Sequence, residues 1–214
     1  MDDFGGVCWL VAGLGNPGRA YAGTRHNVGF AVVERLAAAS GVTFGPGAFQ
    51  SLVARIELGG AAVLLLESQA FMNRSGFPVA SWLARLDLPA AKLLVVHDDL
   101  DLPLGRIRVV AGAGSGGHRG VASIQAVIGT QEFPRIRVGI GRPAGDEAAT
   151  DRVLTEFSPG ELNLLSAVLD RAVAAVQELI RRGPDAAMNR CNVRAVPGEG
   201  LPPADGNGDA CERR

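Results

Sequence analysis

Residues 7–30 read VCWLVAGLGNPGRAYAGTRHNVGF, and their pattern is the strongest indication of the fold class in this sequence. The continuous apolar run at 7–12 is typical of a strand that is buried on both faces. A glycine-rich turn follows at 13–18, and apolar side chains then recur at helical spacing from 27 to 39. The stretch therefore predicts a buried strand, a turn and loop, and a helix, which is the unit from which α/β proteins are built.

The same patterns continue along the chain and predict one folded domain at 1–194. Strands alternate with helices, so we expect an α/β fold: a single-domain three-layer sandwich with a twisted, mixed, mostly parallel sheet flanked by helices. One antiparallel hairpin is expected where Gly59 and Gly60 join two apolar runs. Residues 195–214 are rich in Pro, Gly and Asp and predict a disordered tail. The remaining predicted strands are 52–57, 61–66, 93–97, 106–110 and 135–140, and the helices are 73–86, 118–128 and 159–182, the last ended by Gly183 and Pro184.

Composition excludes several classes of protein. Of the 214 residues 47% are hydrophobic and the formal net charge is −1, which excludes a disordered chain. No apolar run reaches the length of a membrane span, and the acidic N-terminus fits a first strand better than a signal peptide. Three cysteines without metal-ligand spacing predict a reducing cytoplasm, with neither a disulfide framework nor a zinc site. They are Cys8, Cys191 and Cys211.

Basic residues are unevenly distributed. Arginine accounts for all of the 21 basic residues except Lys92, an excess that genome composition alone can produce. Between residues 102 and 145, however, six arginines face a single acid, Glu132. This excess is either an ordinary solvated surface or the footprint of a phosphate backbone. The six are Arg106, Arg108, Arg119, Arg135, Arg137 and Arg142, of which 106 and 108 share one strand face and 135 and 137 another.

Gly13, Gly15 and Gly18 spell the G-x-G-x-x-G pattern of dinucleotide-binding proteins. The context of that fold is missing, because no helix opens at the third glycine and no acidic residue ends a second strand about 20 positions later. Residues 16–18 are Asn-Pro-Gly, a sequence typical of a turn. A nucleotide-binding protein is therefore the weaker interpretation.

Polar side chains stand where two predicted strands end. Asn16 follows the strand at 7–12, and Asp98 follows the strand at 93–97. If these strands are parallel, both residues lie at the edge where α/β sheets bind ligands. An aspartate there can accept a hydrogen bond from an imidazole, such as that of His26, and orient it as a general base. The simpler alternatives are an Asx turn for Asn16 and a backbone-bonded helix start for His26.

The acidic cluster around Asp98 could instead bind a metal, but no second cluster of acids stands at another strand end. We expect no metal, and we expect Asp99 and Asp101 to be solvated in a turn. Asn73, in the sequence FMNRSG, is either a helix N-cap or an amide that donates to a carbonyl in the cleft.

The segment GAGSGGHRG at 112–120 predicts a glycine-rich lid that ends at a helix start. Ser115 lacks the first glycine and the preceding buried strand of a nucleophile elbow, so a serine nucleophile is not expected. His118 and Arg119 follow the glycines, where exposed amides and a guanidinium suit an anionic ligand.

Taken together, the motifs GLGNPGxxYxxTRHNVGF, FMNRSG, HDDLDLPLG and GSGGHRG resemble the bacterial peptidyl-tRNA hydrolase family. The resemblance spans roughly residues 9–193, with the motifs in the family's order. It implies a monomeric α/β enzyme, without metal or cofactor, that cleaves the ester between a peptide and the 3′-terminal ribose of tRNA and so recycles the tRNA. The implied partner is peptidyl-tRNA, through its acceptor stem, 3′ end and peptide, and no membrane is involved.

The resemblance also implies roles for individual residues. His26 matches the catalytic histidine and Asp98 the acid that orients it, while Asn16 and Asn73 match the amides that hold the carbonyl and the attacking water. Arg137 matches a residue that grips a tRNA phosphate. The substrate-channel positions are matched by Tyr21, Met72 and His118.

The chain departs from the family pattern at two positions. Arg119 replaces an asparagine, and Val110 replaces a lysine or arginine. Arg108 and Arg119 are candidates to compensate, and Arg135 is included in the basic footprint. A non-catalytic RNA-binding protein of the same fold is the alternative, which the presence of all four catalytic matches disfavours.

Overall fold

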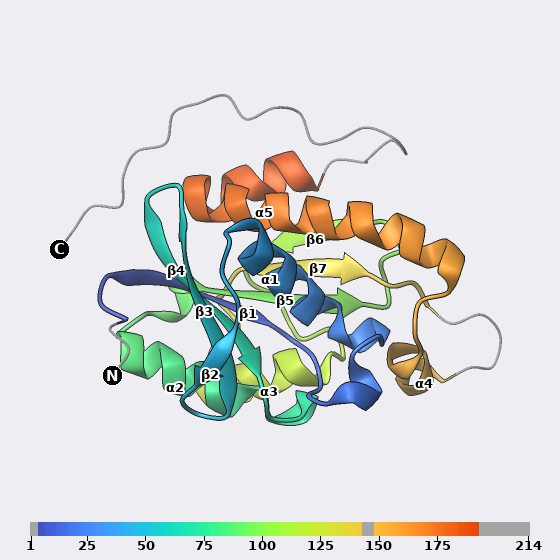
Figure 1. The fold of residues 1–214 in the computed structure, drawn as a ribbon, viewed down its shortest axis with the longest axis horizontal. Helices are drawn as coiled ribbons and strands as arrows, with labels where there is room; N and C mark the ends of the chain where they lie inside the picture. Colours follow the sequence, from blue (N-terminus) through green and yellow to red (C-terminus); the bar gives the residue numbers. More distant parts are fainter. Residues whose placement is uncertain (1–3, 143–147, 193–214) are drawn as a thin grey trace.

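The computed structural model describes residues 4–142 and 148–192 (Figure 1). The tail predicted at 195–214 and the predicted domain end at 194 lie outside the described residues. The described chain forms one seven-stranded sheet in the order β2-β3-β4-β1-β5-β7-β6. Its strands are β1 (Val7–Gly13), β2 (Gly45–Gly47), β3 (Ser51–Leu58), β4 (Ala61–Ser68), β5 (Leu93–Asp99), β6 (Ile107–Val110) and β7 (Arg135–Gly139).

The four central strands are parallel, and both edges of the sheet are antiparallel. The neighbours β4, β1, β5 and β7 run in one direction. Their apolar sequences fit this place, since a parallel strand is covered on both faces. The expected hairpin is confirmed as β3–β4, but two further antiparallel pairs, β2–β3 and β6–β7, were not expected. The short lengths of β2 and β6 explain why periodicity did not reveal these pairings.

Helices cover both faces of the sheet, which confirms the three-layer sandwich (Figure 1). Helices α1 (Val28–Ala39) and α5 (Pro159–Cys191) pack on one face, and α2 (Gly76–Leu86) and α3 (Arg119–Ile128) on the other. Successive side chains of β1 point to opposite faces of the sheet and pack against both helix layers. Trp9 and Val11 face α1 and α5, and Leu10 and Ala12 face α2 and α3. The short elements are η1 (Arg19–Tyr21), η2 (Arg25–Asn27), η3 (Met72–Arg74), η4 (Ala90–Lys92) and α4 (Ala149–Leu154).

Gly183 interrupts α5 at the position where the sequence predicts the helix to end, but a second helical segment follows directly. Gly183 has φ 83° and ψ 170°, which kinks the helix, and the chain then continues as helix to Cys191. Proline is tolerated just after the kink because the first turn of a new helical segment needs no N–H donor. The second segment brings Asn192 to β6, where its side chain bonds the N–H of Val109 at 2.7 Å and the carbonyl of Val109 at 2.9 Å.

The start of α1 lies directly on the sheet. A Cβ at Gly29 would collide with the carbonyl oxygen of Val96 and with the backbone of Leu14, so only glycine permits this approach. As a result the turn η2, which precedes α1, is held at the carboxyl ends of β1 and β5. Within the described residues, no helix combines the length and apolar character needed to cross a membrane.

Candidate active site

A cleft of about 580 Å³ opens at the carboxyl edge of the parallel strands. Strands β1 and β5 pair in parallel, with Gly13 opposite Val96, so Asn16 and Asp98 do lie at one edge as predicted. Asp98 lies within β5 and not after it as predicted, because β5 continues through Asp99 and Asp98 pairs with Val138 of β7. Both Asn16 and Asp98 line the cleft, together with His26.

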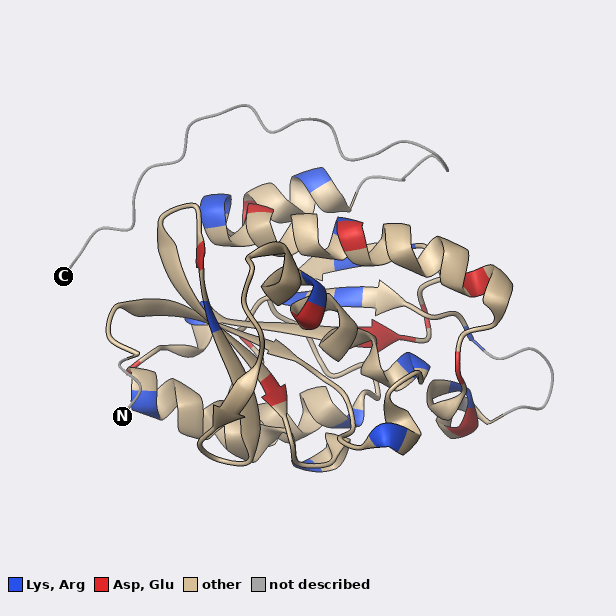
Figure 2. Cartoon of the chain, viewed as in Figure 1, with Lys and Arg blue, Asp and Glu red and all other residues tan. Residues whose placement is uncertain are grey.

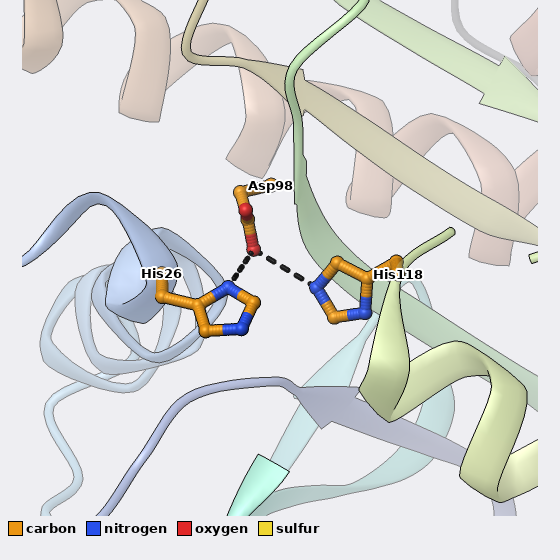
Figure 3. Close-up of side chains that lie close together, drawn as sticks. All are labelled: His26, Asp98 and His118. Carbon is orange, nitrogen blue, oxygen red and sulfur yellow. Dashed lines mark hydrogen bonds and ion pairs between the residues drawn. The ribbon is translucent and has the colours of Figure 1, made fainter. Parts of the chain in front are cut away.

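Two histidines bond to one oxygen of Asp98 (Figure 3). The distance from His26 Nδ1 to Asp98 Oδ1 is 2.8 Å, and the distance from His118 Nε2 to the same oxygen is 2.9 Å. Burial by itself would raise the pKa of Asp98, but the charges and hydrogen bonds of His118 and His26 outweigh it and hold the pKa well below its usual range. Asp98 is therefore a carboxylate that accepts from both rings.

The hydrogen bonds fix which nitrogen of each ring carries a proton. His26 Nδ1–H donates to Asp98, which leaves the lone pair of Nε2 available in the cleft. His118 Nδ1 accepts the Val121 N–H at 3.2 Å as the N-cap of α3, so its proton lies on Nε2 and points at Asp98. His26 is thus the histidine of this pair with a free basic nitrogen.

The same three side chains have ligand atoms within 4.8 Å of one another, a spacing that a metal ion could use. A metal would need the lone pair of His118 Nε2, which instead carries the proton donated to Asp98. The geometry therefore fits a hydrogen-bonded triad better than a set of metal ligands.

His97, a residue without a predicted role, lies beneath this triad. Its ring is buried and packs against His118 with ring centroids 4.7 Å apart. Burial, followed by the charge of His118, lowers the pKa of His97 well below its usual range. A neutral His97 donates from Nδ1 to the carbonyl oxygen of Asp98 at 2.7 Å, and it adds no charge beneath the triad.

Three hydrogen bonds fix Asn16. Two of them are made by Asn27, a residue for which no role was predicted. The Asn27 side chain accepts the Asn16 N–H at 2.9 Å and donates to the Asn16 carbonyl at 2.9 Å. The Asn16 side-chain oxygen accepts the Met72 N–H at 2.8 Å. Its NH₂ group is left as the donor that the cleft can use. The signal for Asn27 was its place beside His26, in a loop that returns to the turn at Asn16.

The residues predicted to line a substrate channel do line this cleft. Met72 is buried, Tyr21 is half-buried, and both line the cleft. Asn73 is exposed, lies in η3 and also lines the cleft, so it is not the N-cap of α2, a position that Ser75 occupies. Phe71, which was not predicted, stacks edge-on against Tyr21 at 6.3 Å and is 55% exposed, which gives this side an apolar surface.

The glycine-rich segment forms the opposite side of the cleft and ends at α3, as predicted. Gly116 and Gly117 have φ 59° and 80°, a backbone conformation that favours glycine. Arg119 is the first residue of α3, and it is exposed and lines the cleft. Ser115 also lines the cleft.

The arginines of the predicted basic footprint differ in burial. Arg137 lines the cleft and forms an ion pair with Asp99. Asp99 is buried, so the prediction that it is solvated is wrong, whereas Asp101 is exposed as predicted. Figure 2 shows acidic residues at the tip of β5 beside basic residues of β7. Arg108, on β6, is exposed and pairs in register with Arg137.

Arg135 is buried, which excludes it from a solvated surface, one of the two interpretations of the arginine excess. Its side chain is 1% exposed and donates to the carbonyl oxygens of Ala113 at 2.6 Å and Gly114 at 3.0 Å. The glycine-rich segment covers it, so Arg135 supports that segment from below. Val110, at the position where a basic residue was expected, pairs in register with Arg135.

Fold and cleft together define an α/β protein whose cleft brings a histidine–aspartate pair and an asparagine amide together. The family described as peptidyl-tRNA hydrolase matches residues 10–198. The peptidyl-tRNA hydrolase of Chloroflexus aurantiacus is 46% identical over 187 residues, which cover 86% of this chain and 98% of the relative. That of Aquifex aeolicus is 44% identical over 186 residues, covering 86% and 95%. The crystal structure of peptidyl-tRNA hydrolase from Acinetobacter baumannii matches with a TM-score of 0.81 and 36% identity, covering 90% of this chain and 98% of that one.

The chain therefore belongs to the peptidyl-tRNA hydrolase family.

Proposed function

We propose that His26, oriented by Asp98, is the general base with which this enzyme hydrolyses the ester bond of peptidyl-tRNA. The family match and the likeness to solved peptidyl-tRNA hydrolases support the reaction. The observation that carries the assignment of the base is the bond from His26 Nδ1 to Asp98 Oδ1 at 2.8 Å, which leaves Nε2 free in the cleft.

The reaction follows from this geometry. His26 Nε2 takes a proton from a water molecule, and the water oxygen attacks the ester carbonyl carbon. The Asn16 NH₂ donates to the developing oxyanion, and Asn73 holds the water or the carbonyl. The tetrahedral intermediate then expels the ribose 3′-oxygen, which receives the proton from the imidazolium. The products are a peptide carboxylic acid and a free tRNA.

Asp98 stabilises the imidazolium that forms during this step. Its pKa is held well below the usual range, so it stays ionised whenever His26 gains a proton. A ribose hydroxyl is also a better leaving group than an amine, so one base and aimed amides suffice. We therefore propose a reaction without metal or cofactor.

The remaining cleft residues are proposed to bind the substrate. Tyr21 and Met72 contact the end of the tRNA or the peptide, and His118 holds Asp98 at the same time. Arg119, at the N-terminus of α3, suits a phosphate. Arg108 and Arg137, opposite each other in register, supply two charges for a second phosphate, with Arg135 acting through the loop above it. We further propose that the enzyme acts as a monomer in the cytoplasm.

The test is release of the amino acid from N-acetyl-aminoacyl-tRNA compared with the unblocked aminoacyl-tRNA. The blocked substrate resembles a peptide ester, so we expect turnover of it alone. Ser115→Ala serves as a matched control, and it should retain wild-type turnover because no step uses that hydroxyl. Failure to hydrolyse the blocked substrate would contradict the proposed reaction, and loss of turnover in the Ser115 variant would contradict the proposed base. A non-catalytic RNA-binding protein would bind the tRNA and leave the ester intact.

A further inference from the structure

The turn η2, which carries His26, is bonded to a distant part of the chain. The Arg25 N–H donates to the Thr155 carbonyl at 3.0 Å, and Thr24 forms an antiparallel bridge with Glu156. Residues 155–158 connect α4 to α5. The backbone immediately before His26 therefore lies against the α4–α5 connection, about 130 residues away in sequence.

The Arg25 side chain reinforces this contact. It is 2% exposed, its Nε donates to Thr155 Oγ1 at 3.1 Å, and its Nη2 donates to Glu161 Oε2 at 2.7 Å. The guanidinium also lies over the Phe157 ring, 4.6 Å from the centroid. A planar, always-charged fork suits this place, because it serves two acceptors and a ring face at once.

Glu161 joins three elements through one carboxylate. Besides Arg25, it accepts the Ser158 N–H at 2.8 Å in the capping box that begins α5, and it lies 3.5 Å from Arg152 of α4. The hydrogen bond from Arg25 is the largest of the effects that lower the pKa of Glu161 to about 2. The Glu161 carboxylate is thus ionised at neutral pH.

Helix α4, on the other side of this joint, borders the cleft. Thr150, Val153 and Leu154 line it, and Leu154 is 46% exposed. Arg25 itself is absent from the lining and does not reach the site of reaction. The joint therefore connects a surface that faces the substrate with the turn that carries the base.

We propose that Arg25, through Glu161, is a positioning residue that holds His26 in fixed relation to the α4 wall of the cleft. This inference rests on the proposed function, with His26 as the base. A displacement of about 1 Å of a catalytic group can cost about 10²-fold in rate. Substrate that contacts α4 is then presented to a base whose backbone is anchored to the same wall.

The test compares Arg25→Met, Glu161→Gln and the double variant on N-acetyl-aminoacyl-tRNA. We expect kcat to fall about tenfold in each single variant, with KM within about twofold of wild type, because the geometry of the base changes while its presence does not. The double variant should be no slower than the slower single variant, since both changes break one joint. If Arg25→Met does not fold, the isosteric Glu161→Gln alone decides the test.

Glu178→Gln is the matched control for stability. Glu178 is a buried acid in α5 that pairs with Arg190 at 3.3 Å and Arg182 at 3.7 Å, remote from η2. We expect its variant to melt at a lower temperature with kcat unchanged. An unaltered kcat in folded Glu161→Gln, or an equal loss of kcat in Glu178→Gln, would overturn the positioning role. Wild-type protein that leaves the blocked substrate intact would instead overturn the proposed function.

Discussion

The two sides of the cleft are built in different ways. On the side formed by residues 13–27, the polar groups are bonded to one another, with Asn16 held by Asn27 and Met72, and His26 by Asp98. On the side formed by residues 111–117, Gly114, Gly116 and Gly117 are exposed, and the side-chain bonds that hold the segment come from Gln125 and Arg135.

This difference separates two tasks. Donors and bases that act on a developing charge must be fixed before the reaction, because their reorganisation would cost activation free energy. A surface that admits a large ligand has no such requirement, and backbone amides with few side chains can accommodate a phosphate. We therefore expect changes on the first side to lower kcat and changes on the second to raise KM.

The largest effect is expected for His26→Ala. Removal of the general base should lower kcat by about 10³-fold or more, while binding of tRNA changes little. Single-turnover hydrolysis of N-acetyl-aminoacyl-tRNA gives the rate, and a filter-binding titration with tRNA gives the affinity. Retention of more than a few per cent of the activity would refute the assignment.

Asn16→Asp should have the next largest effect. The aspartate keeps the shape of the side chain and the oxygen that accepts the Met72 N–H, but it replaces the donor with a negatively charged acceptor. A loss of about 10²- to 10³-fold in kcat is expected, because the oxyanion loses its donor. Steady-state kinetics with the blocked substrate measures this, and a variant whose kcat equals that of wild type would exclude Asn16 from oxyanion stabilisation.

Arg135→Met tests the opposite side of the cleft. The Gly114 carbonyl loses its side-chain donor and the Ala113 carbonyl keeps only Gln125, so substrate binding must order the loop at a cost of about 1 kcal/mol. We expect KM to rise about fivefold with kcat within about twofold of wild type. Arg55→Met, a change at an arginine on β3 away from the cleft, should alter neither constant. A fall in kcat with KM unchanged in the Arg135 variant would contradict the expectation that changes on this side of the cleft affect substrate binding.

Glu67→Gln should affect stability and leave kinetics unchanged, because Glu67 lies at the end of β4 and does not line the cleft. Burial, and then the charge of Glu34, raises the pKa of Glu67 to about 8. A carboxyl whose folded pKa exceeds its unfolded value of 4.5 destabilises the fold increasingly as the pH rises from about 4.5 to 8.

The glutamine variant should therefore be more stable than wild type by on the order of 2 kcal/mol at pH 9, and nearly equal to it at pH 4. Urea unfolding at the two pH values measures the difference. A gain in stability that is the same at both would show that titration of Glu67 is not its cause.

Much of the fold could be predicted from sequence, because burial imposes periodicity. The apolar runs of β1 and β5 and the helical spacing of α1 are local patterns, and each is sufficient to assign its element. The edge pairings were less visible, since β2 has three residues and β6 four. The break at Gly183 is visible in the sequence, but the second helical segment that follows it and docks on β6 through Asn192 is not.

The sequence alone indicates the candidates for the proposed chemistry, since Asn16, His26 and Asp98 stand at or near strand and helix ends that parallel topology brings together. The partners of these side chains depend on three-dimensional packing. Whether Asp99 is buried against Arg137, or Arg135 lies beneath a loop, depends on what covers each side chain. Those neighbours come from segments distant in sequence, and local periodicity contains no information about such packing.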